Sequence, residues 1–176
     1  MDIIPLLYVR DNQLIGGDII SDKKVEHVYL MDLDGWFANQ PDLELYQKLS
    51  YSSSLWIDSA PRRFEDVMDI VVAGAERITI REDTYREDTK QIFDEIEIEK
   101  FIGISLNDSM NQPSEPWDGV VTYVTNQPNL QEEEQISLFA SKFNVWLLLK
   151  ENNFINIKWA EENGIKGIIL PLEESV

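Results

Sequence analysis

Short apolar runs alternate with amphipathic segments along the chain. The runs are rich in β-branched residues and bounded by turn residues, which predicts strands at residues 3–9, 27–33, 54–58, 77–81, 101–106, 120–125, 144–149 and 167–170. Apolar residues at helical spacing predict helices at residues 42–49, 62–73, 131–143 and 152–163. Apolar strands in alternation with helices predict an α/β fold with a parallel sheet that helices cover.

The two halves of the chain resemble each other. Asn39-Gln40-Pro41 recurs as Asn126-Gln127-Pro128, and Trp56 recurs as Trp146, at a separation of about 90 residues. Such a repeat indicates that one supersecondary unit was duplicated.

Eight strands in two matching halves predict a compact (β/α)8 TIM barrel. We expect a single domain over residues 1–176, built from two similar half-barrels at about 1–88 and 89–176. Several outer helices should be short or missing, because residues 10–26 suit a hairpin and residues 107–118 contain two prolines. Bare barrel wall is apolar, so we expect a partner subunit to cover it, in a homodimer.

The amino-acid composition limits the classes of partner that the protein can bind. The 176 residues include 33 acidic and 15 basic side chains, for a net charge of −18, which disfavours nucleic acid and anionic membranes as partners. The chain has no cysteine, which excludes disulfides, thiolate metal sites and a cysteine nucleophile. No leader and no apolar window of about 20 residues is found, so we expect a soluble, cytoplasmic protein.

Three segments of the first half carry a family resemblance. They are Ile3-Ile4-Pro5-Leu6-Leu7, Tyr29-Leu30-Met31-Asp32-Leu33-Asp34-Gly35 and Asp58-Ser59-Ala60-Pro61-Arg62. These residues resemble the histidine-biosynthetic phosphoribosyl isomerases and their paralogues, the HisA/HisF group, which implies a two-fold duplicated (β/α)8 barrel. Within that group the chain looks closest to uncharacterised HisA-related proteins of methanogenic archaea and methylotrophs. The resemblance therefore also implies a link to tetrahydromethanopterin-linked one-carbon metabolism.

The isomerase chemistry of that family does not carry over. Its isomerising members use one acid at the end of the first strand and another at the end of the fifth. Here Tyr8 stands at the first position, and Leu106 or Asn107 at the second. Where the family has glycine-rich phosphate-binding turns, this chain has Asp58-Ser59-Ala60-Pro61 and Leu149-Lys150-Glu151-Asn152. We therefore do not expect phosphoribosyl isomerase activity.

Acids dominate the positions at the C-terminal ends of the predicted strands, where barrel enzymes place their chemistry. The candidate catalytic residues are Asp32, Asp58 and Asp108. The candidate ligand-binding residues are Asp34, Arg62, Arg81, Glu82, Asn107, Asn126 and Lys150. Carboxylates that converge on one opening raise one another's pKa or gather a divalent cation. The pattern predicts an acidic mouth for a cationic, amine-bearing or metal-bound small molecule, with Arg62 or Arg81 holding an acidic tail of that ligand. The alternative is that these acids simply face water.

The sequence Asp32-Leu33-Asp34-Gly35 also resembles the signature of phosphatases that use an aspartate nucleophile. That chemistry requires a Thr or Val after the glycine, a downstream lysine and a paired acidic Mg²⁺ site. Trp36 occupies the position after the glycine. A phosphatase is therefore the minor alternative, and a turn in which Asp34-Gly35 closes the second strand is favoured.

Two functions of different classes stay open. The first is a small-molecule enzyme or binding protein that uses the acidic mouth, with Asp32, Asp58 and Asp108 as acid–base or cation-binding groups. The second is a non-catalytic barrel that acts as an assembly or regulatory subunit. The sequence indicates no particular cofactor and no defined metal ligand set, and whether the protein is an enzyme stays open.

Overall fold

The computed structural model describes residues 1–15, 25–106, 112–151 and 154–172 of the chain. The chain divides into two compact units. One is Leu6–Lys100, and the other combines Met1–Pro5 with Phe101–Val176. The boundary at Lys100 lies later in the chain than residue 88, where the sequence repeat places it.

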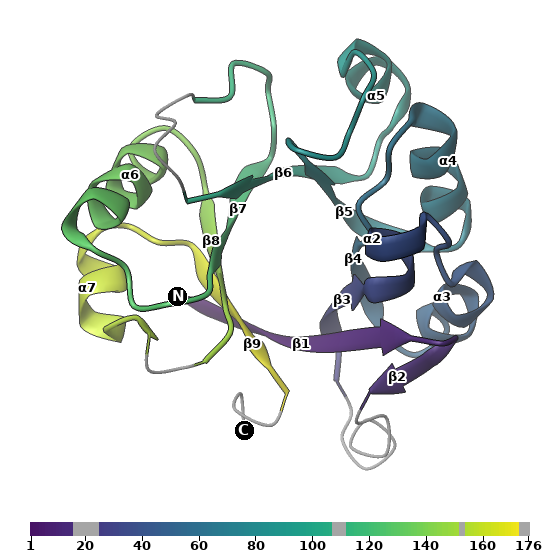
Figure 1. The fold of residues 1–176 in the computed structure, drawn as a ribbon, viewed down its shortest axis with the longest axis horizontal. Coiled ribbons are helices and arrows are strands. Elements are labelled where there is room, and N and C mark those ends of the chain that lie inside the picture. The colour runs from purple at the N-terminus through teal and green to yellow at the C-terminus, as the bar shows by residue number, and fades with distance from the viewer. Residues whose placement is uncertain (16–24, 107–111, 152–153, 173–176) are drawn as a thin grey trace. The chain divides into compact units, whose positions relative to one another are not determined.

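The unit Leu6–Lys100 contains a parallel sheet whose strands lie side by side in chain order (Figure 1). Its strands are β1 (Asp2–Arg10), β3 (His27–Asp32), β4 (Ser54–Asp58) and β5 (Ala75–Arg81). Its helices are α2 (Leu33–Ala38), α3 (Leu43–Ser50), α4 (Phe64–Val72) and α5 (Lys90–Glu95). Helix α3 packs on β4 and helix α4 packs on β5, so a helical layer covers one face of this sheet.

A short hairpin begins the chain. Strand β2 (Gln13–Ile15) pairs antiparallel with β1, with Arg10 opposite Gln13. The two residues between the strands, Asp11 and Asn12, both have left-handed φ angles of 52° and 59°. Asp and Asn tolerate that conformation, which two-residue hairpin turns require. The hairpin predicted from residue 10 onward is therefore confirmed in its first part, and residues 16–24 lie outside the described ranges.

Helix α4 illustrates how local sequence sets the element boundaries. The Asp66 carboxylate accepts hydrogen bonds from the backbone N–H groups of Arg62 and Arg63, both at 3.0 Å, and so caps the start of the helix. Val67 and Ile70 lie on one side of the helix and are fully buried. Gly74 follows the last turn with a φ of 110°, a conformation that favours glycine and ends the helix.

The second unit repeats the same alternation. Its strands β6 (Glu99–Ser105), β7 (Gly119–Val124), β8 (Val145–Leu149) and β9 (Gly167–Pro171) are parallel and lie in chain order, and the start of β1 pairs with β9. Helix α6 (Leu130–Ala140) follows β7, and helix α7 (Ile157–Glu162) follows β8. The Asn129 and Asn156 side chains cap the starts of these helices, as Asn typically does.

The α/β class is confirmed. The strands are parallel, lie in chain order and are joined by helices, as in an α/β barrel. All eight strands expected from the sequence are present, with ends that differ by about two residues or fewer. Several helices are short, as predicted: α5 and α7 have six residues each, and the described residues between β6 and β7 form no helix. No helix within the described ranges is both long and apolar enough to cross a membrane.

One local prediction was wrong. Asp34-Gly35 does not close the second strand but forms the first turn of α2, which begins at Leu33. The Asp32 carboxylate accepts hydrogen bonds from the N–H groups of Asp34 and Gly35 and so caps that helix. The run of apolar residues up to Leu33 favoured a longer strand, and the helix forms because Asp32 satisfies its first donors.

Candidate functional site

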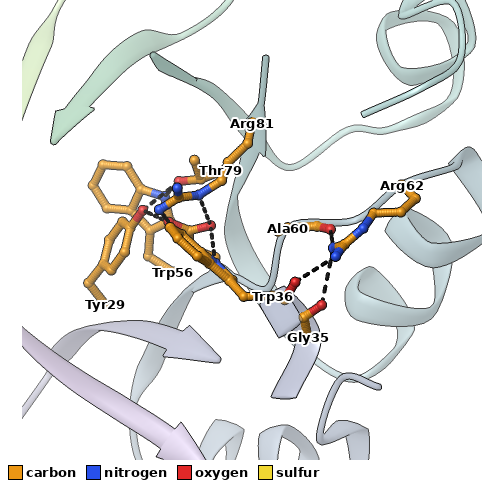
Figure 2. Close-up of polar contacts among 9 residues, drawn as sticks. Tyr29, Gly35, Trp36, Trp56, Ala60, Arg62, Thr79 and Arg81 are labelled. Carbon is orange, nitrogen blue, oxygen red and sulfur yellow. Dashed lines mark hydrogen bonds and ion pairs between the residues drawn. The ribbon is translucent and has the colours of Figure 1, made fainter. Parts of the chain in front are cut away.

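Five large polar or aromatic side chains gather on one face of the sheet in the unit Leu6–Lys100. Tyr29 of β3, Trp56 and Asp58 of β4, and Thr79 and Arg81 of β5 form one connected network (Figure 2). Alternate residues of a strand face opposite sides of the sheet. The pairing of Tyr29 with Trp56 and of Met31 with Asp58 therefore places these residues on a common face.

Asp58 lies at the centre of this network and is fully buried. Arg81 donates to both carboxylate oxygens, from Nε to Oδ1 and from an Nη atom to Oδ2, each at 3.2 Å. The Tyr29 hydroxyl donates to Oδ2 at 2.7 Å, and Trp36 Nε1 donates to Oδ1 at 3.3 Å. Each oxygen thus accepts two hydrogen bonds, which uses the acceptor capacity of a carboxylate. Asp58 is consequently held as a structural anion rather than presented as a free base.

Arg81 lies between this carboxylate and an aromatic ring. Its Cζ atom is 3.0 Å from the centroid of the Trp36 ring, and its side chain is almost completely buried. The planar guanidinium suits both contacts, because it bonds a carboxylate in bidentate fashion and stacks on aromatic faces. Trp36 belongs to α2, so the network ties the first turns after β3 to the ends of β4 and β5.

Further back along the strands, Thr79 joins two aromatic side chains. Trp56 Nε1 donates to the Thr79 hydroxyl at 2.9 Å, and the same hydroxyl lies 3.0 Å from the Tyr29 hydroxyl. The rings of Tyr29 and Trp56 are 5.0 Å apart and tilted by 58°, a favourable geometry for an aromatic pair. The polar atoms of these buried rings are satisfied, so the network stabilises a single arrangement of the site.

Arg62 binds backbone carbonyl groups instead of a carboxylate. One Nη atom donates to the carbonyl oxygens of Gly35, at 3.1 Å, and Ala60, and the other donates to Trp36, at 2.6 Å (Figure 2). Two of these carbonyls belong to α2, whose partial negative charge a cation complements. Ala60 has a left-handed φ of 52°, which costs free energy for a residue with a Cβ atom. Arg62 therefore holds the loop after β4 against α2.

Asp32 points to the opposite face of the sheet from Asp58. It is fully buried, and its Oδ1 accepts from the N–H groups of Asp34 at 2.9 Å and Gly35 at 3.2 Å. Its Oδ2 accepts from the N–H of Asp42 at 2.8 Å and from the hydroxyl of Tyr46 in α3. The structure therefore separates two of the predicted catalytic residues, because Asp32 faces the helices while Asp58 faces the other side.

A group of three acids lies where Asp32 meets the start of α3. Asp32, Asp34 and Asp42 each offer a carboxylate oxygen within 4.8 Å of the others. Burial raises the pKa of Asp42 to about 7, and a hydrogen bond to Asp34 and the charges of Asp32 and Asp34 add to that effect. Burial and the Asp32 charge likewise raise the pKa of the Tyr46 hydroxyl, which stays protonated as a donor.

The remaining predicted residues are spread over both units. Glu82 is exposed and follows β5, while Asn126 and Lys150 are exposed and belong to the other unit. Asn107 and Asp108 lie outside the described residues. Tyr8 stands where the HisA/HisF isomerases have their first acid. It is half-buried, and burial raises its pKa, so it is not a base near neutral pH.

Sequence reasoning missed Tyr29, Trp36, Asp42, Tyr46 and Thr79 as parts of the site. Tyr29 and Tyr46 occur in apolar patterns that equally describe an ordinary core. Asp42 stands directly before a helix, where the expected role is a cap. A signal was present in Trp36, an aromatic residue next to the Asp-Leu-Asp-Gly turn, but its contact with Arg81 depends on the tertiary fold.

Comparison with known proteins identifies no family. The chain matches no protein-family model, and no curated protein matches it. The resemblance to the HisA/HisF group therefore rests on the residues quoted for it and stays a prediction.

Proposed function

We propose that the protein binds a cationic or amine-bearing small molecule at the C-terminal ends of β4 and β5. The Asp58–Arg81 pair and Trp36 form the fixed polar floor of that site. Trp36 is half-buried, and aromatic side chains attract cations. Glu82 and Asp83 follow β5 and are exposed beside it.

The charges near the C-terminal ends of β4 and β5 support a cationic ligand. Arg81 is neutralised by Asp58, and Arg62 is bonded to three carbonyl groups. The exposed acids Glu82 and Asp83 add two negative charges at these strand ends, in a chain that carries a net charge of −18. These acids disfavour an anionic ligand such as a sugar phosphate.

The hydrogen bonding of the two buried aspartates favours binding over acid–base catalysis. All four acceptor positions of Asp32 and all four of Asp58 are filled by donors of the protein itself. A general base must have a lone pair within reach of the substrate proton. The same observation favours a second candidate function, a non-catalytic barrel that serves as an assembly or regulatory subunit.

We further infer that the chain is a duplicated half-barrel related to the HisA/HisF group, and that it forms a homodimer. Matched local geometry supports the duplication: Gly74 after α4 and Gly164 after α7 both have positive φ, and Trp56 and Trp146 are both buried. A role in tetrahydromethanopterin-linked metabolism rests on the family resemblance alone. Light scattering of the purified chain tests the dimer directly.

A thermal-shift screen of amines, pterins and sugar phosphates tests the ligand proposal. A ligand at a hundred times its dissociation constant stabilises the folded state by about 2.7 kcal/mol. We expect an amine to raise the melting temperature, with a reduced shift in Glu82→Gln. The matched control is Glu97→Gln, since Glu97 is an exposed glutamate that precedes β6 at the other end of the strands. No response to any amine, together with melting that depends on protein concentration, would favour the non-catalytic subunit instead.

A further inference from the structure

We propose that Asp34 and Asp42 bind a hard divalent cation, with Asp32 behind them as a third negative charge. The three carboxylates offer oxygens within 4.8 Å of one another, at the junction of β3, α2 and the start of α3. Magnesium and calcium bind through carboxylate oxygens, and magnesium in particular needs only one or two carboxylates and keeps several waters.

The first independent observation is the conformation of Asp42. This residue is the N-cap of α3, and its carbonyl accepts the N–H of Tyr46 at 3.1 Å, but its side chain makes no capping hydrogen bond. An Asp side chain at an N-cap normally accepts an N–H of the first turn, which contributes about 1 kcal/mol. Asp42 instead lies against Asp34 and near Asp32, the two charges that repel it most. A ligand of positive charge explains why the side chain is placed there.

The second observation is an unpartnered oxygen. Asp42 is only 6% exposed, and its Oδ2 atom is buried without a hydrogen-bond partner among the described residues. A buried carboxylate oxygen without a partner is costly, and native proteins rarely retain one. A cation bound by the cluster would give this carboxylate a partner of opposite charge.

The surrounding charges leave the cluster without a protein counter-ion. None of the ion pairs found within the described ranges involves Asp32, Asp34 or Asp42. Asp32 has both oxygens bonded to donors of the protein, so it contributes charge while Asp34 and Asp42 supply the ligand atoms. Asp34 is half-buried, which gives an ion and its waters a route to the site from solvent.

This site is separate from the small-molecule site proposed above. Asp32 faces the helices and Asp58 faces the opposite side of the sheet, so neither proposal depends on the other. A bound cation would join α2 to the start of α3, the two helices that connect β3 to β4. We therefore expect it to stabilise the fold locally.

Binding of Mn²⁺, followed by its paramagnetic resonance signal in about 0.15 M salt, tests the proposal on the full chain. We expect one saturable site that Mg²⁺ displaces. Asp42→Asn and Asp34→Asn should each weaken binding at least about tenfold. Asp69→Asn is the matched control, because it removes the same charge from the exposed side of α4 and should leave the affinity unchanged.

Two results would overturn the cation site. One is the absence of a saturable site in the natural sequence, with only diffuse association that salt abolishes. The other is unchanged Mn²⁺ affinity in folded Asp42→Asn or Asp34→Asn, with folding checked by circular dichroism. If Asp42→Asn fails to fold, Asp34→Asn decides the matter, because the Asp34 side chain is half-exposed and its loss is tolerated more easily.

Discussion

Arg81 is held between the carboxylate of Asp58, at 3.2 Å from both oxygens, and the ring of Trp36, at 3.0 Å from its centroid. Both charged groups of this pair are buried. A buried ion pair contributes little net free energy when complete, but removal of one partner leaves the other charge without compensation.

We therefore expect Arg81→Leu to destabilise the fold by about 3–5 kcal/mol, because Asp58 would then be a buried charge without its cation. Arg81→Lys keeps the charge but loses the bidentate geometry and the stacking, and should cost less. Urea denaturation followed by circular dichroism measures both variants. A loss within error of zero for Arg81→Leu would contradict the structural role assigned to the pair.

Tyr46→Phe tests the hydrogen bonds by which Asp32 links α2 to α3. The change removes the hydroxyl that donates to Asp32 Oδ2 and leaves that buried oxygen with the Asp42 N–H alone. We expect a loss of about 1–3 kcal/mol in the free energy of unfolding. Tyr51→Phe, at a tyrosine that is 92% exposed, serves as the control and should be neutral.

Gly35→Ala tests the close approach between α2 and the loop after β4. A Cβ atom at residue 35 would lie 2.5 Å from the Ser59 carbonyl oxygen and 2.8 Å from the Ser59 Cβ. The backbone must shift to avoid this clash, so we expect the free energy of unfolding to fall by about 1–3 kcal/mol. Gly164→Ala is a useful contrast, since nothing lies within 4 Å of an added Cβ there. Its cost should come only from the left-handed φ of 72°, about 1–2 kcal/mol.

The raised pKa of Asp42 predicts how stability depends on pH when a chelator removes divalent cations. Burial, followed by Asp34 and Asp32, raises this pKa from 3.8 to about 7 in the folded state. The folded state thus holds the proton more tightly than the unfolded chain. Stability from this group is complete below about pH 4 and is lost as the pH rises toward 7. Asp42→Asn cannot lose a proton, so it should gain stability over the natural sequence as the pH rises from about 5 to about 8.

Urea titrations at several pH values, with a chelator present, measure that gain. Asp69→Asn again provides the control, because it changes the net charge equally without touching the cluster. Parallel pH profiles for Asp42→Asn and the natural sequence would show that Asp42 titrates normally.

Much of the fold followed from the sequence. The short apolar runs at residues 54–58 and 167–170 predict strands, and the amphipathic segment at 62–73 predicts a helix, through local patterns alone. The position of Asp58 at the end of a strand followed from the same pattern. Local periodicity suffices for such elements because it fixes which side of each element is apolar.

Only the tertiary structure decided what the acids do. Asp32 and Asp58 look alike in the sequence, since each ends an apolar strand, but the pairing of Met31 with Asp58 puts their side chains on opposite faces of the sheet. Their partners Tyr46 and Arg81 come from later elements, and no local pattern encodes which element a side chain will meet. The sequence by itself therefore determined the α/β alternation and the acidic strand ends. The long-range register determined that two of these acids are structural anions, because their hydrogen-bond donors are assembled only when the strands pair and the helices pack.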